Sequence, residues 1–246
     1  MLKKIAITVL IFFFPIKLIA FLLKILGCDV GKNVKIGFSI LKIRENIFIE
    51  KNVKIGHFNF IEIDNLFLHT GSVIKNLNYI KGPFDLNLGK KCIIAKFNII
   101  TRLKCYWYKK SVLSLSYNTM ITRGHKIDCS RSIFIGDNSI IAGSGSQLWT
   151  HGYHHEKTGA GRIRIDGEIY IGNNVYVGSR CVFNPSVKIA DGISIGSNSS
   201  VSKSLMEPGL YVSQPLRFIE LDIEIARKKL NKINDEKLIE EVYEKI

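Results

Sequence analysis

Hydrophobic residues recur every six positions in the second half of the chain. Stepping by six from Ile165 reaches a hydrophobic residue each time: Ile171, Val177, Phe183, Ile189, Ile195 and Val201. A small or turn-favouring residue often follows, as at Gly172, Gly178 and Gly196. A helix repeats its faces every 3.6 residues, so this spacing instead indicates short strands separated by sharp turns. The repeat is typical of a parallel β-helix, in which the recurring aliphatic residues stack inward.

The same spacing occurs upstream, interrupted by changes of phase. The upstream positions are Val30, Ile36, Ile43, Ile49, Ile55, Ile61, Leu68, Ile74, Ile80, Leu88, Ile94, Ile100, Ile135 and Ile141. A β-sandwich would give turn signals every 8–12 residues or so and no six-residue register. We therefore predict a single all-β domain, a parallel β-helix over residues 28–219, with loops or irregular turns at the phase breaks.

One long interruption stands out in residues 148–164, which read LWTHGYHHEKTGAGRIR. The six-residue spacing requires an aliphatic residue at positions 147, 153 and 159. These positions hold Gln147, Tyr153 and Gly159 instead, and the spacing resumes only at Ile165. We expect this segment to leave the β-helix as a loop. Loops that project from a rigid scaffold often carry catalytic side chains.

The two ends of the chain have their own patterns. A β-helix must cover its terminal coils, because a bare coil exposes apolar ladders and unpaired strand edges. Residues 1–27 are strongly apolar, and residues 220–246 place apolar side chains at helical spacing with charges between them. We predict an apolar helical segment at the N-terminus and an amphipathic α-helix at the C-terminus, each a candidate cap.

The N-terminal segment also suggests a membrane contact. Between Ile5 and Leu23 only Lys17 is charged, and Pro15 interrupts the run. This combination favours a segment that lies in the membrane interface with its lysines near phosphate headgroups. The alternatives are a spanning helix, a secretory signal, a lipoprotein signal ending before Cys28, and a buried helix that caps the β-helix.

Composition narrows the function classes. The 246 residues carry a formal net charge of +14, with the excess in the first 219 residues, and such a field attracts membranes, nucleic acids or phosphorylated cofactors. No nucleic-acid-binding motif accompanies the charge, so we expect no nucleic-acid partner. The five cysteines are far apart and form no CxxC pair, which indicates reduced thiols in a cytoplasmic protein.

Residues 140–219 resemble the hexapeptide-repeat O-acetyltransferases, a group that holds galactoside, maltose and many polysaccharide acetyltransferases. The resemblance lies in residues 150–155 (THGYHH), 171–179 (IGNNVYVGS), 184–187 (NPSV), 201–203 (VSK) and 214–219 (QPLRFI). It implies a left-handed parallel β-helix, a homotrimer, and acetyl-CoA as co-substrate without a metal. The repeat alone is specific only for the fold, since it also builds carbonic anhydrases and non-catalytic scaffolds.

By this resemblance His151 matches the catalytic histidine of the family. Transfer of an acetyl group to a hydroxyl needs a base, and a neutral imidazole can accept the proton near pH 7. Trp149 could form a wall of the acceptor pocket or simply anchor the loop. His154 and His155 could orient the acceptor or be solvated. Their spacing around Gly152 does not favour a zinc site with His151.

The resemblance also implies a set of donor-binding residues, in a groove between neighbouring subunits. These are Tyr176, Gly178, Ser179, Lys203 and Arg217. The two basic residues would contact the CoA phosphates, and the alternative for each is a solvated surface charge. The sequence departs from the family at residues 213–215, which read SQP where the family usually has GVP.

We predict an acetyl-CoA-dependent O-acetyltransferase that modifies a sugar hydroxyl in cell-surface polysaccharide or lipopolysaccharide synthesis. The basic, apolar N-terminus fits a lipid-linked glycan acceptor. It also fits a cytoplasmic location, peripheral to the inner face of the cytoplasmic membrane. The alternatives are an acetyltransferase for a soluble small molecule or amino sugar, a non-catalytic β-helix scaffold, and a metal-dependent hydratase.

Overall fold

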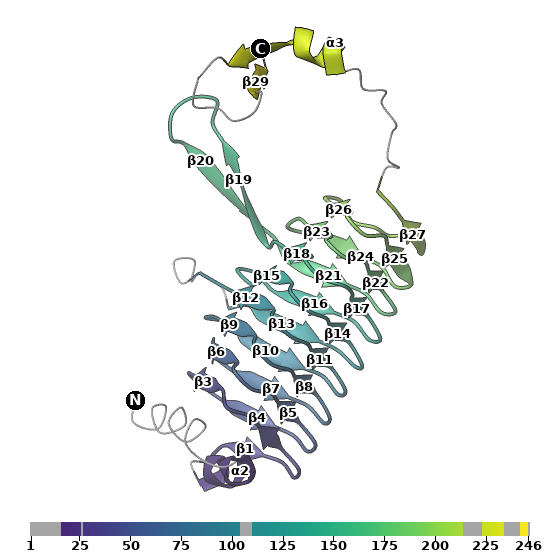
Figure 1. The fold of residues 1–246 in the computed structure, drawn as a ribbon. Helices are drawn as coiled ribbons and strands as arrows, with labels where there is room; N and C mark the ends of the chain where they lie inside the picture. The colour runs from purple at the N-terminus through teal and green to yellow at the C-terminus, as the bar shows by residue number, and fades with distance from the viewer. Residues whose placement is uncertain (1–15, 26, 104–109, 214–222, 234–241, 246) are drawn as a thin grey trace. The chain divides into compact units, whose positions relative to one another are not determined.

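The structure is a computed structural model that describes residues 16–25, 27–103, 110–213, 223–233 and 242–245 (Figure 1). The chain forms two units, Met1–Ser213 and Gln214–Ile246. Nearly all regular structure of the first unit is short parallel strands, which wind through three sheets in turn. The predicted left-handed parallel β-helix is confirmed as the fold class of this unit.

The sheets are called A, B and C here, in the order in which each coil visits them. Sheet A contains β1 (Asp29–Val30), β4 (Ile47–Ile49), β7 (Leu66–Leu68), β10 (Asp85–Leu88), β13 (Val112–Leu115), β16 (Ile133–Ile135), β21 (Ile169–Ile171) and β24 (Lys188–Ile189). Sheet B contains β2 (Lys35–Ile36), β5 (Lys54–Ile55), β8 (Val73–Ile74), β11 (Ile93–Ile94), β14 (Met120–Ile121), β17 (Ile140–Ile141), β22 (Tyr176–Val177), β25 (Ile193–Ile195) and β27 (Gly209–Tyr211). Sheet C contains β3 (Ile40–Ile43), β6 (Phe60–Ile63), β9 (Tyr79–Lys81), β12 (Ile99–Thr101), β15 (Lys126–Asp128), β18 (Gln147–Leu148), β23 (Val182–Phe183) and β26 (Ser200–Val201).

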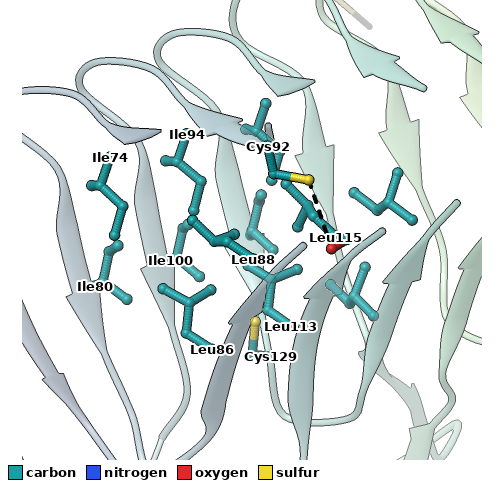
Figure 2. Packing of buried hydrophobic residues seen from close by; sticks show 14 of the residues in the cluster. Ile74, Ile80, Leu86, Leu88, Cys92, Ile94, Ile100, Leu113, Leu115 and Cys129 are labelled. Atoms are coloured by element: carbon teal, nitrogen blue, oxygen red, sulfur yellow. Dashed lines mark hydrogen bonds between the residues drawn. The ribbon is translucent and has the colours of Figure 1, made fainter. Parts of the chain in front are cut away.

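The core is a set of aliphatic ladders along the axis of the β-helix. Figure 2 shows the isoleucines and leucines of successive coils packed inside it, with the buried thiols of Cys92 and Cys129 among them. All the predicted ladder positions from Val30 to Ile141 are buried, and so are the positions from Ile171 to Val201. The six-residue spacing therefore located the core correctly on both sides of the interruption.

One predicted ladder position is wrong. Ile165 is 38% exposed and lies outside the coils, on a strand of the projecting segment. The ladder resumes at Ile169 and Ile171, which pair with Ile133 and Ile135 of the preceding coil. The six-residue spacing from Ile165 to Ile171 is therefore coincidental, because a projecting strand can also carry isoleucine.

Helix α2 (Ile16–Ile25) covers the first coil. It packs on β1 and β2, and its Leu23 is fully buried in the same core cluster as the ladders. Phe21 and Ile25, on the other side of the helix, are exposed. This arrangement supports the capping interpretation of the N-terminal segment, whose first fifteen residues lie outside the described part of the chain.

Among the described residues, no helix is both long enough and apolar enough to cross a membrane.

The second unit differs from the predicted C-terminal helix. Helix α3 spans only Ile223–Lys228, and an antiparallel pair follows, β28 (Leu230–Ile233) with β29 (Val242–Lys245). Leu230 and Ile233, two of the residues at helical spacing, lie in a strand. A segment as short as residues 230–233 (LNKI) is too short for the spacing of its apolar residues to distinguish a helix from a strand, and here it pairs with residues 242–245 (VYEK).

Candidate active site

The segment that breaks the repeat is a β-hairpin at the corner between sheets C and A. Its strands β19 (His151–His155) and β20 (Arg162–Asp166) pair antiparallel and extend beyond the coils (Figure 1). Thr150, at the base, is fully buried, and its carbonyl accepts a hydrogen bond of 2.9 Å from the Gly167 backbone N–H. The predicted departure from the β-helix is a hairpin with a fixed base, but its bounds differ from residues 148–164: Leu148 stays buried in β18 of sheet C, and the second strand of the hairpin continues to Asp166.

Asp128 lies under this base at the end of β15. Its side chain is only 6% exposed, and hydroxyl and amide groups surround it. Ser130 Oγ donates to Oδ1 at 2.8 Å, while Thr150 Oγ1 lies 2.5 Å and the Thr150 amide nitrogen 3.2 Å from Oδ2. These donors satisfy both oxygen atoms of the buried side chain.

His151 is the fourth partner of this carboxylate. Its Nδ1 atom lies 2.8 Å from Asp128 Oδ2, and the imidazole is 17% exposed. A carboxylate can only accept, so Nδ1 must carry the hydrogen, and a neutral ring then has its lone pair on Nε2. The carboxylate thus fixes both the orientation and the tautomer of His151, which leaves Nε2 free to act as a base.

Two aromatic rings flank His151. Trp149 and Tyr153 each meet the imidazole edge-to-face, with ring centroids 6.2 Å and 6.0 Å away. Trp149 also donates from Nε1 to Gln147 Oε1 at 3.0 Å, and it is 36% exposed. The indole is therefore both held in place and accessible. This placement is consistent with the predicted role as an acceptor wall.

The hairpin register places the other two histidines on different faces. Alternate residues of a strand point to opposite faces, so His155 shares the face of His151 and His154 lies on the opposite one. Both are exposed. Of these two predicted acceptor-binding residues, only His155 lies on the same face of the hairpin as His151.

Paired polar groups stiffen the face that carries His151. Arg164 lies opposite Tyr153 and donates to its hydroxyl at 3.2 Å and to Asp166 Oδ1 at 2.6 Å. The Arg162 guanidinium stacks 4.7 Å from the centroid of the Tyr153 ring. Aromatic and guanidinium groups on one face suit recognition of a hydroxylated or anionic acceptor.

The predicted donor-binding residues lie at two different corners. Tyr176 is exposed on sheet B, and Gly178 and Ser179 follow it at the corner between sheets B and C. Lys203 is exposed at the corner between sheets C and A, on the same side as the hairpin. Arg217 lies outside the described residues. Within one chain, the width of sheet C separates His151 from Gly178 and Ser179.

Gly178 has a structural reason to be glycine. A Cβ atom there would lie 2.7 Å from the backbone nitrogen of Ser197 in the next coil. Its small size is therefore required by the stacking of coils, whether or not a ligand binds nearby.

The buried thiols do not offer an alternative nucleophile. Burial raises the pKa of Cys92 to about 11, and it also raises the pKa of the fully buried Cys129 and of Cys181. A thiol with a raised pKa is protonated near pH 7 and reacts poorly. This chemistry favours direct transfer by a base over an acyl-cysteine intermediate at these three residues.

Asp128 was not found from the sequence. In the register of sheet C it continues an outward-facing column formed by Lys42, Glu62, Lys81 and Thr101. In the sequence, Asp128 looks like any other polar residue of this outward-facing column. It is buried because the base of the hairpin folds over it, with Thr150 lying 22 residues further along the chain.

The fold and this site define a parallel β-helix protein with a carboxylate-oriented histidine on a projecting hairpin. Two curated proteins are similar in sequence to parts of the chain. The galactoside O-acetyltransferase of Escherichia coli (strain K12) is 38% identical over 94 residues, which cover 36% of this chain and 43% of that protein. A probable macrolide acetyltransferase of Lysinibacillus sphaericus is 39% identical over 59 residues, which cover 24% of this chain and 33% of that protein. The similarity to hexapeptide-repeat acetyltransferases is thereby confirmed, although the matched residues span less than half of either relative.

Two solved structures align with most of this chain at low sequence identity. The polysialic acid O-acetyltransferase OatWY is 19% identical with a TM-score of 0.46, over 78% of this chain and 87% of that chain. The polySia-specific acetyltransferase NeuO is 20% identical with a TM-score of 0.44, over 78% and 84% of the two chains. No model of a protein family matches the chain.

Proposed function

We propose that this protein is an O-acetyltransferase that uses acetyl-CoA to acetylate a sugar hydroxyl. The observation that carries the proposal is the 2.8 Å contact between His151 Nδ1 and Asp128, at the base of an exposed hairpin. The similarity to two acetyltransferases supports the reaction class. The flanking aromatic rings and arginines suit a sugar acceptor, because sugars pack against aromatic faces and donate and accept hydrogen bonds.

The proposed reaction is a direct transfer. His151 Nε2 removes the proton of the acceptor hydroxyl while its oxygen attacks the thioester carbonyl of acetyl-CoA. The carbon–sulfur bond then breaks, the acetyl group stays on the acceptor oxygen, and the imidazolium returns the proton to the departing CoA thiolate. Asp128 stabilises the imidazolium formed between these steps, as the aspartate of a catalytic triad does for its histidine.

The acceptor and the donor bind to different groups of residues. Trp149 and His155 contact the acceptor, and Tyr176, Gly178, Ser179, Lys203 and Arg217 bind the donor. The protein works as a homotrimer with a lipid-linked glycan acceptor of cell-surface polysaccharide or lipopolysaccharide synthesis. The apolar N-terminus holds it at the inner face of the cytoplasmic membrane.

Substitution of His151 tests the proposal. Free-thiol release from acetyl-CoA is measured with a panel of glycan acceptors for wild type and His151→Ala. Loss of the base should lower turnover by about 10²-fold or more with acetyl-CoA binding retained. The matched control is His154→Ala, which removes a neighbouring histidine from the opposite face and should leave turnover within a few-fold of wild type.

The other outcomes distinguish the alternatives. If wild type turns over free sugars or amino sugars as fast as lipid-linked glycans, the acceptor is a soluble molecule. If His151→Ala and His154→Ala lose activity equally, the assignment of the base is wrong. If wild type does not bind acetyl-CoA, the transferase proposal fails and a non-catalytic scaffold takes its place.

A further inference from the structure

The outward-facing side chains of sheet A form a column in which aromatic rings alternate in pairs with small polar groups. We call it the aromatic track. In order along the axis, each one the register partner of the next, its residues are Phe48, Phe67, Asn87, Ser114, Phe134 and Tyr170. The three phenylalanines are partly exposed, and Tyr170 is 38% exposed. The track runs along sheet A for about 24 Å, from a coil near α2 to the coil that follows the hairpin (Figure 1).

The equivalent column of sheet B is aliphatic. Its middle coils present Val73, Ile93, Met120 and Ile140 on the outer face. Aliphatic residues therefore provide the cross-strand contacts that the outer face of a sheet needs in this protein. The fold does not require the flat rings of sheet A or the polar residues between them, so a binding function is the better explanation of both.

The rings of the track are arranged so that a ligand can reach their faces. Phe134 and Tyr170 are nearly parallel, at an interplanar angle of 15°, with centroids 5.0 Å apart. Stacked carbon atoms are in contact at about 3.5–4.0 Å, so the two rings overlap only in part. Part of each face stays uncovered and can pack against the C–H groups of a sugar ring. Asn87 and Ser114, between the two aromatic pairs, can exchange hydrogen bonds with sugar hydroxyls.

A hollow of about 410 Å³ lies at the first end of the track. Phe48 forms part of its wall, and its polar lining consists of Asp29, Lys32, Glu50, Lys51 and Thr70. The Glu50 carboxylate is fixed, because it accepts from Thr70 Oγ1 at 2.5 Å and from the Thr70 N–H at 2.8 Å and lies 3.0 Å from His69 Nδ1. The hydrogen bond from the Thr70 hydroxyl, with those from His69 and the Thr70 N–H, lowers the pKa of Glu50 to about 2. An aromatic wall with a few fixed polar groups is typical of a small-molecule site.

The other end of the track adjoins the candidate active site. Tyr170 donates from its hydroxyl to Glu168 Oε2 at 2.5 Å, and Glu168 follows two residues after the end of β20. A guanidinium nitrogen of Arg131 lies 3.8 Å from Glu168 Oε1, and the Arg131 N–H donates to Thr150 Oγ1 at the hairpin base. A chain bound along the track would therefore reach the base of the hairpin that carries His151.

Charge indicates which kind of chain fits. Nucleic-acid bases also stack on aromatic rings, but their phosphates need a positively charged groove. The two carboxylates of the hollow balance its two ammonium groups, and Glu168 adds a carboxylate at the other end. We propose that the track and the hollow bind a neutral oligosaccharide chain, with the hollow holding one end and the other end directed to His151. That this chain is the acceptor rests on the proposed function, whereas the binding itself does not.

The test is the binding of neutral hexasaccharides in the absence of acetyl-CoA, measured by isothermal titration calorimetry. The probes are maltohexaose, xylohexaose and N-acetylchitohexaose. The variant Phe134→Leu/Tyr170→Leu keeps apolar side chains on the strands but removes both rings. We expect wild type to bind at least one probe, and the variant to bind it more weakly by about tenfold.

A stacked pair on another sheet provides the matched control. Phe60 and Tyr79 lie on sheet C with ring centroids 5.2 Å apart, and Phe60→Leu/Tyr79→Leu should bind the probe as wild type does. Melting temperatures confirm that both double variants are folded. If the track variant is destabilised, the single change Phe67→Leu in the middle of the track replaces it and should weaken binding by about threefold.

The opposite results would overturn the inference. Wild type that binds none of the three probes shows that the track is not a site for neutral glycans. Equal loss of affinity in the track variant and in the control variant places the bound probe elsewhere. Unchanged affinity in Phe48→Leu would show that the hollow does not hold the end of the chain.

His151→Ala separates this inference from the proposed function. The variant lacks the proposed base but keeps the track, so it should bind the probe within about twofold of wild type, whereas loss of binding would place the probe at the hairpin. Wild type that binds a hexasaccharide but transfers no acetyl group to any glycan would reject the proposed function and leave the track standing. Transfer to short sugars without hexasaccharide binding would do the reverse.

Discussion

Two histidines, one at each of the corners that border sheet C, have opposite surroundings. At the B–C corner His125 is fully buried, with Nδ1 accepting from the Ser146 N–H at 3.1 Å and Nε2 lying 3.0 Å from Thr122 Oγ1. At the C–A corner His151 is partly exposed and its Nδ1 contacts a carboxylate. Burial among neutral groups lowers the pKa of His125 to about 4. The comparison shows that the partner on the ring, not the residue type, separates a structural histidine from a candidate base.

The largest effect on turnover is expected when the Asp128 carboxylate is replaced by a neutral amide. Asp128→Asn keeps the size of the side chain but can no longer fix the Nδ1–H tautomer of His151 or stabilise the imidazolium. We expect kcat to fall by about 10²–10³-fold with little change in KM for acetyl-CoA. Steady-state kinetics by thiol release measure both parameters.

Asp191→Asn is the matched control for that substitution. Asp191 is a surface aspartate at the A–B corner whose carboxylate accepts hydrogen bonds from Asn173. It should leave kcat within a few-fold of wild type. Equal kcat for Asp128→Asn and wild type would mean that His151 needs no carboxylate.

The buried His125 should make the stability of the protein depend on pH. His125 titrates near 4 in the folded chain and near 6.5 when unfolded, so the unfolded chain binds more protons between these values. Stability should therefore fall as pH drops from about 6.5 to 4, by about 3 kcal/mol for this residue. His125→Asn should remove that part of the acid sensitivity, because Asn98 holds the same turn position one coil earlier.

Urea unfolding at pH 7 and pH 4.5 measures the effect. The difference between the two midpoints should be smaller for His125→Asn than for wild type. His154→Asn, which replaces an exposed histidine of the hairpin, is the control and should keep the wild-type difference. An unchanged difference in His125→Asn would show that other groups set the acid sensitivity.

The regular part of the fold could be predicted because each buried ladder position is recognisable in the sequence as an aliphatic residue. Every coil repeats the same local requirement, an aliphatic side chain inside and a tight turn after it, so a six-residue spacing is enough to place Ile171 or Val177. Ile165 misled the prediction because spacing alone cannot tell a coil from a projecting strand. The C-terminal helix was predicted too long for a related reason, since Leu230 and Ile233 fit a strand pattern equally well.

The candidate site could be predicted only in part. The resemblance to the hexapeptide-repeat acetyltransferases pointed to His151, and the interruption of the six-residue spacing pointed to the segment that carries it. Asp128 depends on a contact between two coils, and that contact forms only after the hairpin base has folded over the outward column of sheet C. The division of the predicted donor residues between two corners likewise follows from where each sheet ends, which the order of residues alone does not reveal.

The smallest effect on kcat is expected from loss of the hydrogen bond that Ser130 donates to Asp128. Ser130→Ala removes the donor to Asp128 Oδ1 and leaves the Thr150 groups and His151 in place. Loss of one hydrogen bond to a partly satisfied carboxylate should cost about 1 kcal/mol of transition-state stabilisation, which lowers kcat by about fivefold. Ser132→Ala, a buried serine of the same turn, is the control and should leave kcat unchanged. If Ser130→Ala instead lowers kcat as far as Asp128→Asn does, the whole hydrogen-bonded cluster, and not the Asp128–His151 contact, determines the position of the base.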